Sequence, residues 1–385
     1  MRILVISNLY PPQVLGGYER SIADFARLLQ HRGHTVEVLT SDMPEYYAEH
    51  QSSYREPEIL RCVKLAGKWA QGKGGEWLSD EQVKQIFADN RKEIAARIDS
   101  FCPDVALVGN LDLLHTIPLQ ALLSANIPTV HYVMNSKPGY PPELTPKTPL
   151  YQYATCSNWV TESLQQAGFL AETAQTIYPG AIIEEFYQSE LPVRDHLRIA
   201  YASLVMAYKG ADVLIEALGI LQVWGIPFSA TIAGGNFNQE YVEALEQFVI
   251  DEGINNLVKF VGALSRRELS HMYKTHNVLV FPSRFQEPFG ISQIEAMAAG
   301  LALVTSGTGG AREIVEDGQD GLLFESENAI DLADKLSYLA AEPNQWEAIA
   351  RRGQQKAVTQ FNQTNAVEEL ETLFQKLLHL KSSYC

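Results

Sequence analysis

Residues 281–300 read FPSRFQEPFGISQIEAMAAG, and this stretch places a strand, a polar loop and a helix one after another. Phe281 ends an apolar run, and Gly300 is placed to end the helix. Inside the helix, the apolar residues recur at the spacing of one helical face: Ile291, Ile294, Met297 and Ala298. Strands that alternate with helices are typical of a parallel, doubly wound sheet. The stretch therefore predicts an α/β fold.

The start of this helix is suited to bind an anion. The backbone N–H groups of Phe289, Gly290 and Ile291, together with the helix dipole, favour a phosphate or a sugar hydroxyl. Glu287 precedes the helix and Glu295 lies inside it, so the two carboxylates could bind different parts of one extended ligand. The alternative is that both are solvated surface residues. We favour binding because Glu295 stands in a nearly all-apolar helix, where a carboxylate needs a partner.

The second half of the chain repeats the strand and helix pattern. The predicted strands are Leu197–Ala202, Phe228–Ala233, Leu257–Val261 and Val278–Phe281, and the predicted helices between them are Gly210–Leu221, Glu240–Ile250 and Ser265–Tyr273. Two further helices, Asn344–Phe361 and Ala366–Leu380, have no following strand. This alternation predicts a parallel sheet with helices on both faces.

The first half begins with the same kind of unit. Arg2–Ile6 is a short apolar strand, residues 22–29 have helical periodicity that ends before Gly33, and Thr35–Leu39 is a second strand. The apolar runs that continue the pattern are Asp104–Val108 and Thr129–Met134. We therefore expect two Rossmann-like, doubly wound domains, with ligands at the carboxyl ends of the strands and in a cleft between the domains.

A polar segment with a proline, Ser189–His196, predicts the linker and hinge between these domains. We place the N-terminal domain at residues 1–190 and the C-terminal domain at residues 191–365. A last helix of about residues 366–385 is expected to pack back on the first domain. Closure of the two domains would exclude water from a ligand between them.

The composition excludes several classes of protein. With 46% hydrophobic and 20% charged residues, the chain is an ordinary globular protein. Its 30 basic and 46 acidic residues give a net charge of −16, which disfavours a nucleic-acid partner. No apolar run approaches the roughly 18 residues of a membrane span, and no secretory signal precedes the first strand. We expect a cytoplasmic protein, with peripheral contact to the inner face of the membrane left open.

Taken together, these features resemble a known family. Glu287, seven further residues and Glu295 are similar to the donor-site signature of the retaining, GT-B-fold glycosyltransferases of family 4 (group 1). Further stretches that look like this family are residues 1–40, Asn256–Gly262, Thr308–Glu313 and Asp317–Leu323. The resemblance thus covers nearly the whole chain, and it implies a GT-B architecture with an acceptor-side first domain and a donor-binding second domain.

The resemblance also implies roles for the residues of the second domain. It implies that Glu295 holds the nucleotide ribose, that Glu287 lies near the donor sugar, and that the backbone of Gly262 and Ala263 reads the base. Without the rest of the signature, Gly262 and Ala263 would be an ordinary strand-to-helix turn.

The predicted cations of the donor site depart from the family pattern. Lys209 precedes a predicted helix, and its ammonium could neutralise a leaving diphosphate, as a lysine at this place does in the family. Where the family usually has Gly-Arg, this chain has Ser203-Leu204, so one cation is missing. Arg284 in the neighbouring loop is a candidate substitute, although an exposed loop arginine is the commoner reading.

In the first domain, Gly16 and Gly17 could let the backbone approach a ligand closely, or could form a flexible loop. His131 lies where the family often has a His-Asp pair, so the resemblance implies contact with the donor sugar or the reaction centre. A lone histidine in a strand is otherwise more often structural. Three residues after another predicted strand could contact an acceptor: Asn110, Asp112 and His115.

Residues 45–79 interrupt the alternation, and they predict an insertion or an active-site loop. The aromatic residues of this stretch could stack on sugar rings, or could fold onto their own domain, which is commoner: Tyr46, Tyr47, Trp69 and Trp77. Residues 67–74 mimic a phosphate-binding P-loop but lack the final Ser or Thr, so we reject a kinase or ATPase.

Neither a D-x-D nor an HExxH pattern is present, so no metal is expected. The four cysteines are scattered, and we expect them to be reduced and structural. The resemblance implies a hexosyltransferase that retains anomeric configuration, and we expect a UDP-sugar donor, with UDP-glucose first, and a saccharide or lipid-linked acceptor. Two alternatives stay open: a binding protein of this fold without turnover, suggested by Ser203-Leu204, and an epimerase or phosphorylase.

Overall fold

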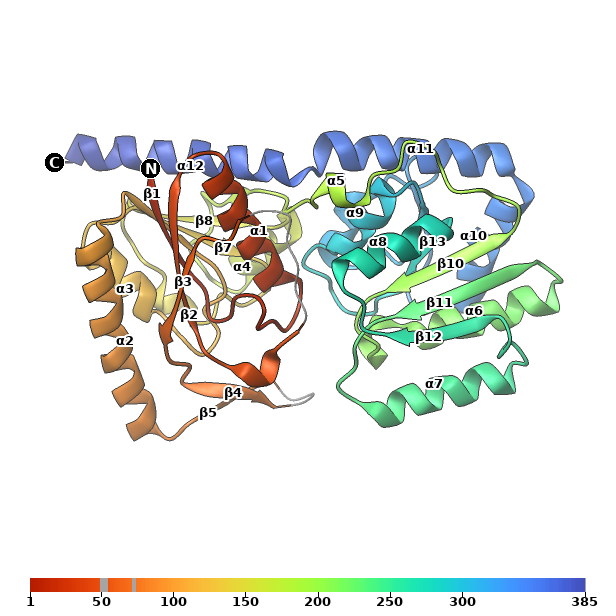
Figure 1. Cartoon of the computed structure of the whole chain (residues 1–385), viewed down its shortest axis with the longest axis horizontal. Helices are drawn as coiled ribbons and strands as arrows, with labels where there is room; N and C mark the ends of the chain where they lie inside the picture. Colours follow the sequence, from red (N-terminus) through yellow and green to blue (C-terminus); the bar gives the residue numbers. More distant parts are fainter. Residues whose placement is uncertain (49–54, 71–73, 385) are drawn as a thin grey trace. The chain divides into compact units, whose positions relative to one another are not determined.

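The structure is a computed structural model, and it describes residues 1–48, 55–70 and 74–384. By its internal contacts the chain divides into unit 1, Met1–Pro179 with Thr364–Cys385, and unit 2, Gly180–Gln363. This division falls before the predicted linker at residues 189–196, which therefore lies within unit 2. Each unit is built around its own parallel sheet (Figure 1).

Unit 1 contains a seven-stranded sheet in the order β3-β2-β1-β6-β7-β8-β9. Every neighbouring pair in it is parallel, and Ile3 of β1, for example, lies opposite Val36 of β2 and Val105 of β6. The strands are β1 (Arg2–Ile6), β2 (Thr35–Ser41), β3 (Glu58–Val63), β6 (Val105–Val108), β7 (Thr129–Val133), β8 (Tyr151–Thr155) and β9 (Gln175–Thr176). The central strands β1, β6 and β7 are mostly apolar and buried, which suits a sheet that is covered on both faces.

Helices cover both faces of this sheet. Figure 1 shows α1 on one side of it and the pair α2 and α3 on the other. The helices of unit 1 are α1 (Gly17–His31), α2 (Asp80–Phe101), α3 (Ile117–Ser124), α4 (Asn158–Gln166) and most of α12 (Gln363–Tyr384). Glu371 of α12 binds both Arg32, at 2.8 Å, and His34, at 2.8 Å, which fastens α12 beside the end of α1.

Residues 45–79, predicted to be an insertion or an active-site loop, contain regular secondary structure. The described residues of this stretch include a short 3-10 turn, Pro44–Tyr46, and β3, which adds a strand to the edge of the sheet. They also form an antiparallel hairpin of β4 (Gly67–Ala70) and β5 (Gly74–Trp77). β3 escaped notice because its residues EILRCV mix charged and apolar side chains, as suits an edge strand with one solvated face.

Unit 2 contains a six-stranded parallel sheet in the order β12-β11-β10-β13-β14-β15. Its strands are β10 (Leu197–Ala202), β11 (Phe228–Ala233), β12 (Val258–Gly262), β13 (Val278–Phe281), β14 (Ala302–Thr305) and β15 (Leu322–Leu323). β10 and β13 are neighbours although 75 residues separate their ends, 202 and 278, so the chain reverses direction across the sheet here. Ligands bind at such a switch point in doubly wound sheets.

The helices of unit 2 form one layer on each face of the sheet. Figure 1 shows α6 and α7 on one side and α8 and α9 on the other, and α6 packs against α10 while α9 packs against α11. The helices are α5 (Ile183–Phe186), α6 (Ala211–Val223), α7 (Gln239–Asp251), α8 (Arg266–Thr275), α9 (Ile291–Ala298), α10 (Ala329–Ala341) and α11 (Pro343–Gln360). The core between them is apolar, with Ile199, Val280 and Leu336 fully buried.

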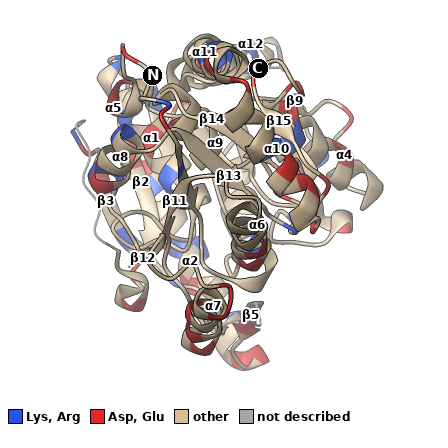
Figure 2. Cartoon of the chain, turned by 90° about the vertical axis from the view of Figure 1, so that its right-hand side faces the viewer, with Lys and Arg blue, Asp and Glu red and all other residues tan. Residues whose placement is uncertain are grey.

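The distribution of charge in unit 2 follows these layers. In Figure 2, β13 and β14 carry no charged residue, whereas red acidic positions gather on the outer helix α7.

The strands and helices predicted for residues 197–281 are confirmed to within two residues at each end, because apolar periodicity and burial agree there. Gly300 also follows the end of α9, with a φ of +82° that favours glycine.

Candidate functional site

An ion pair lies at the switch point of the unit 2 sheet. Lys209 follows β10, and its Nζ lies 2.5 Å from Oε1 of Glu287, in the loop that follows β13. The hydroxyl of Ser283 donates to the same oxygen at 2.5 Å. Both ionic side chains are largely buried, at 13% exposure for Lys209 and 7% for Glu287. Two predicted site residues are thus brought into direct contact.

Close backbone approaches fix the position of this pair. Gly210, with φ +71°, begins α6 directly after Lys209, and a Cβ there would lie 2.0 Å from the carbonyl oxygen of Pro282. A Cβ on Gly309 would lie 2.5 Å from the carbonyl oxygen of Glu287, and the Gly310 N–H donates to that oxygen at 2.7 Å. Glycine at 210 and 309 therefore lets two loops pack directly on the backbone around the pair.

Glu287 has one oxygen left for a ligand. Both of its side-chain hydrogen bonds to the described residues end on Oε1, and none of those residues binds Oε2. Lys209 likewise uses one of its three N–H donors on Glu287. The pair can therefore accept from a ligand hydroxyl and donate to a ligand oxygen without breaking its internal bonds.

The guanidinium of Arg284 is bound to carboxylates of the protein and is not left free for a ligand anion. Its guanidinium binds both oxygens of Asp212, at 2.8 and 2.7 Å, and lies 3.3 Å from Glu327. It also donates to the carbonyl of Ala207 at 2.7 Å. Burial acts to raise the pKa of Asp212, but the hydrogen bonds and charge of Arg284 outweigh this and hold the pKa below its usual value. The predicted contact of Arg284 with diphosphate stays a prediction.

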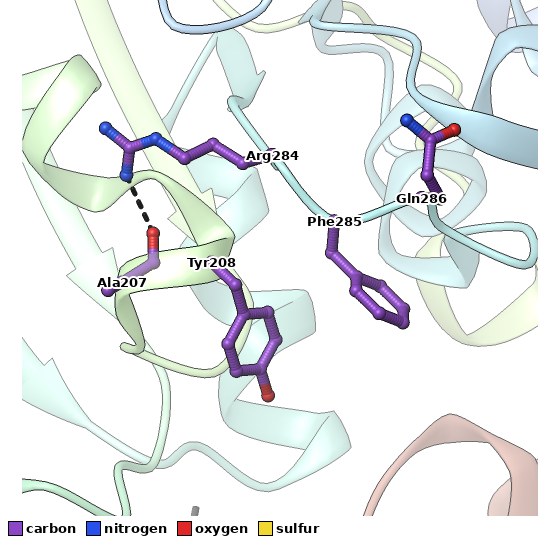
Figure 3. A pocket seen from close by; sticks show the side chains of 5 residues that line it. All are labelled: Ala207, Tyr208, Arg284, Phe285 and Gln286. Carbon is purple, nitrogen blue, oxygen red and sulfur yellow. Dashed lines mark hydrogen bonds between the residues drawn. The ribbon is translucent and has the colours of Figure 1, made fainter.

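A pocket of about 530 Å³ opens between the loops that carry Lys209 and Glu287 (Figure 3). In this view the rings of Tyr208 and Phe285 project in the same direction, and their centroids lie 5.8 Å apart. Lys209 Nζ lies 5.4 Å from each ring centroid, within the range of a cation–π contact. The remaining lining residues are Ala207, Arg284 and Gln286. Both rings are partly exposed, at 40% and 47%, so a ligand can reach them.

The start of α9 has the predicted form. Gly290 precedes the helix with φ +104°, and it has no side chain to cap the amide groups of the first turn. Phe289 is buried at 1% exposure, and Ile291 begins the helix. Glu295 is 8% exposed, and burial together with the charge of Glu295 raises the pKa of Tyr273. The ligand roles of these residues stay predictions.

Gly262 ends β12 and Ala263 follows it. Gly262 has φ +70° and no atom within 4 Å of an added Cβ, while its carbonyl accepts from the N–H of Gly234 at 2.8 Å. The glycine is thus required by its backbone angle and not by close packing. Contact with a base stays a prediction.

In unit 1, Gly16 and Gly17 lie exposed at the start of α1. Gly16 has an extended φ of −167°, and no atom lies within 4 Å of an added Cβ, so the fold does not require glycine there. The carboxylate of Glu19 accepts from the N–H of Gly16 at 3.0 Å and so occupies part of the helix N-terminus. A ligand would share this position with Glu19.

The three residues considered for acceptor contact lie after β6. The side chain of Asn110 accepts from the N–H of Asp112 at 3.0 Å. Burial, together with the charge of Glu19, raises the pKa of Asp112 to about 6, although Asn110 opposes the shift. His115 has φ +56° and packs against Phe87 at 5.8 Å, and burial lowers its pKa.

His131 lies in β7 with no exposed surface. Its Nδ1 lies 3.0 Å from the Tyr151 hydroxyl and 3.3 Å from the Tyr140 hydroxyl, and Nε2 has no hydrogen-bond partner among the described residues. Burial lowers the pKa of His131 to about 3. The implied contact with a donor sugar stays a prediction.

The aromatic residues of 45–79 pack partly on their own unit. Tyr46 and Trp69 meet edge to face at 5.4 Å, and Trp77 contacts Phe87 at 6.4 Å. Tyr47 and Trp77 are nevertheless exposed at 67% and 50%, so both readings of this stretch retain support.

Several residues of the site escaped the sequence analysis. Ser283 binds Glu287, Asp212 binds Arg284, and Thr308 holds the loop after β13 through the carbonyl of Phe285 at 2.6 Å. Single Ser, Thr and Asp residues give no pattern that would separate them from solvated loop residues. Tyr208, next to Lys209, was the one aromatic neighbour that the sequence could have indicated.

Among residues 1–48, 55–70 and 74–384, no group of three or more His, Cys, Asp or Glu side chains is placed to hold a metal ion. None of the helices in that part of the chain is both long and apolar enough to cross a bilayer. In the described part of the chain, Cys62, Cys102 and Cys156 form no disulfide bond.

Comparison with known proteins gives a consistent result. Residues 183–356 match the family described as glycosyl transferases group 1. The chain is 25% identical to the uncharacterized glycosyltransferase MJ1607 of Methanocaldococcus jannaschii, over 97% of this chain and 98% of that protein. It resembles the solved structure of a glycosyltransferase from Rickettsia africae ESF-5, with a TM-score of 0.78, 16% identity and 98% of both chains covered.

It also resembles the solved complex of Anabaena Alr3699/HepE with UDP-glucose, with a TM-score of 0.73 and 21% identity, over 98% of this chain and all of that one. At these identities the two solved structures establish the fold, and the family match and the full-length relative agree with it. Residues 183–356 therefore belong to the glycosyl transferases group 1 family (GT4), and the chain is a glycosyltransferase with the GT-B fold.

Proposed function

We propose that the protein is a retaining hexosyltransferase that moves glucose from UDP-glucose to a saccharide or lipid-linked saccharide, in polysaccharide or glycoconjugate biosynthesis. The observation that carries the donor site is the Lys209–Glu287 pair. Oε2 of Glu287 can accept from a hydroxyl of the donor sugar, while the remaining N–H groups of Lys209 donate to the diphosphate. The choice of UDP-glucose draws on the solved complex of Alr3699/HepE, which holds that nucleotide sugar.

The chemistry then follows from where charge develops. The bond between the anomeric carbon and the diphosphate oxygen breaks, and the acceptor oxygen attacks from the same face. Its proton passes to the departing phosphate oxygen, so no protein base is needed for this step. Lys209 and the uncapped start of α9 at Gly290 stabilise the negative charge on the diphosphate. No metal is assigned a role in this proposal.

The other predicted residues take the roles that the family resemblance implies. Glu295 holds the ribose, and the backbone of Gly262 and Ala263 reads the base. Gly16 and Gly17 admit the ligand to the start of α1, where packing does not require glycine at position 16.

Calorimetric binding of nucleoside diphosphates and their sugars tests the donor site. We expect micromolar binding of UDP and UDP-glucose, unchanged by added magnesium or by EDTA, and at least tenfold weaker in Glu295→Ala. Glu246→Ala, an exposed glutamate of α7, is the matched control and should bind as the wild type does. If no nucleotide binds the wild type, the proposed donor site is wrong.

One observation favours a second candidate, a nucleotide-sugar-binding protein without turnover. Leu204 stands where the family has arginine, and Arg284 is already neutralised by Asp212, so the diphosphate has one cation fewer. Release of UDP from UDP-glucose in the presence of a saccharide panel separates the two functions. Binding without any release in the wild type, with release appearing in Leu204→Arg, would favour the binding protein.

A further inference from the structure

Three tyrosines surround the buried His131 in unit 1. His131 in β7 lies opposite Tyr153 in β8, Tyr151 lies two residues earlier in β8, and Tyr140 lies in the connection between the two strands. The Tyr140 hydroxyl is 2.8 Å from the Tyr151 hydroxyl and 2.7 Å from the Tyr153 hydroxyl. The Tyr151 hydroxyl is in turn 3.0 Å from Nδ1 of His131. These atoms form one chain of hydrogen bonds, from Tyr153 through Tyr140 and Tyr151 to His131.

Each proton in this series of hydrogen bonds can be assigned to a donor atom. Burial raises the pKa of Tyr140 and of Tyr151, so their hydroxyls keep their protons. Burial lowers the pKa of His131 to about 3, so its ring is neutral near pH 7 and carries one proton, on either Nδ1 or Nε2.

If the hydroxyls donate toward His131, every hydroxyl proton has an acceptor. Tyr153 donates to Tyr140, Tyr140 donates to Tyr151, and Tyr151 donates to Nδ1, which must then be unprotonated. The ring proton is on Nε2, and that N–H is the one group left without a partner in the described part of the cluster.

The opposite direction leaves two groups without partners. Nδ1–H would donate to Tyr151, and the Tyr153 hydroxyl at the far end would have no acceptor among the described residues. Nε2 would also be a buried acceptor without a donor. Because a buried polar group without a partner destabilises the folded protein, the arrangement that leaves fewer such groups, the first one, is favoured.

Gly109 borders both His131 and a second buried group that lacks a partner among the described residues. The carbonyl of Gly109, after β6, is close enough to act on the pKa of His131. A Cβ on Gly109 would lie 3.1 Å from the Ser7 hydroxyl, which has no hydrogen-bond partner among the described residues. Ser7 follows β1, so both groups border Gly109 at the carboxyl ends of adjacent strands.

We propose that Tyr140 and Tyr151 are positioning residues that fix His131 in the tautomer with its proton on Nε2. His131 then offers a bound sugar hydroxyl or other ligand oxygen a neutral N–H donor, and it does not act as a base through Nε2. The contact with a ligand oxygen rests on the proposed function, whereas the tautomer is a property of the protein without ligand.

The tautomer can be measured directly. Long-range proton–nitrogen NMR spectra of the full chain, labelled with ¹⁵N-histidine, distinguish a protonated from an unprotonated ring nitrogen. The signals of His131 are identified by their absence in His131→Asn. We expect unprotonated Nδ1 and protonated Nε2 at pH 7. A protonated Nδ1, alone or together with Nε2, would overturn the proposal whatever the protein binds.

Matched Tyr→Phe variants test the direction of the chain. Tyr153→Phe removes only the first donor, so the tautomer should be retained. The double variant Tyr140→Phe/Tyr151→Phe removes both hydroxyls within reach of Nδ1, so we expect a changed or mixed tautomer. If the double variant keeps the wild-type spectrum, these tyrosines do not position His131. If the double variant fails to fold, the spectra of the wild type and of Tyr151→Phe still test the proposal. In Tyr151→Phe, Nδ1 of His131 keeps only its longer contact, 3.3 Å to the Tyr140 hydroxyl.

A kinetic measurement connects the tautomer to function. With whichever donor the binding experiment identifies, kcat/KM for nucleotide release should fall about tenfold or more in the double variant, the loss that corresponds to about 1.4 kcal/mol. Tyr187→Phe, an exposed tyrosine of unit 2, should stay within twofold of the wild type. An unchanged rate together with a changed tautomer would overturn the ligand contact alone, and absent nucleotide binding would count against the proposed function instead.

Discussion

Lys209 Nζ and Glu287 Oε1 lie 2.5 Å apart, and they join the ends of two strands, β10 and β13, that are neighbours in the unit 2 sheet. They are 78 positions apart in the sequence. Because both side chains are largely removed from water, each charge depends on the other for compensation. The pair therefore contributes both to the stability of unit 2 and to the charge that a donor diphosphate meets.

Removing one partner of this pair should cost more than removing both. Lys209→Met leaves a buried carboxylate without its cation, and we expect the free energy of unfolding to fall by about 3 kcal/mol. Lys209→Met/Glu287→Gln should recover more than half of that loss, because no uncompensated charge remains. Urea unfolding of the four proteins of this cycle gives the coupling energy. Losses that simply add would show that the two charges do not compensate each other.

Gly210 should be far less replaceable than Gly225, although both have φ +71°. An alanine at either position pays the same backbone strain of roughly 1 kcal/mol. At Gly210 the new Cβ would also lie 2.0 Å from the carbonyl oxygen of Pro282, whereas no atom lies within 4 Å at Gly225. We expect Gly210→Ala to lower the melting temperature by several degrees more than Gly225→Ala does, since the loops beside Lys209 must move apart. Equal melting temperatures would contradict this account of the packing.

The sequence predicted well those elements in which periodicity and burial agree. The strands of residues 197–281 are short, mostly apolar segments between helices with one apolar face, so pattern and structure coincide. β3 was not predicted because an edge strand has one solvated face and a mixed sequence. β14 and α10, which complete the unit 2 sheet and its helical layer, also received no prediction.

For the candidate site, the sequence indicated Lys209 and Glu287 but not the contact between them. That contact depends on which strands become neighbours, and the order β12-β11-β10-β13 is a property of the whole sheet. The sequence also left open whether Arg284 is exposed or bound to a ligand, and the structure shows a third state in which Asp212 binds it. The sequence around His131 did not indicate its tyrosine neighbours, because Tyr140 lies in the loop between β7 and β8.

The stability of the protein should depend on the ionisation of Asp112. Burial and the nearby Glu19 raise the pKa of this carboxyl from 3.8 to about 6, so the folded protein binds the proton more tightly than the unfolded chain does. The resulting stabilisation is fully present below pH 4 and is lost as the pH rises through 6. At pH 8 the folded protein must hold a charge that its surroundings disfavour.

Asp112→Asn removes this penalty. We expect the variant to be more stable than the wild type by on the order of 2 kcal/mol at pH 8, with the gain shrinking toward zero near pH 4. Denaturant unfolding between pH 4 and pH 8 measures the effect. Asp99→Asn, an exposed aspartate of α2, is the control and should show no such pH dependence. A gain for Asp112→Asn that is the same at both ends of the range would rule out the raised pKa as its source.

The role of Arg284 can be resolved through its partner Asp212. If the guanidinium acts by fastening the loop after β13 to α6, then Arg284→Gln and Asp212→Asn both break the same bidentate ion pair. Each single variant should then weaken UDP binding by a similar factor, on the order of tenfold, and the double variant should be no weaker than either. If Arg284 instead contacts the diphosphate, Arg284→Gln should lose much more affinity than Asp212→Asn. Because the bidentate pair already occupies N–H donors of both terminal guanidinium nitrogens, we expect the first result, measured by calorimetry with UDP.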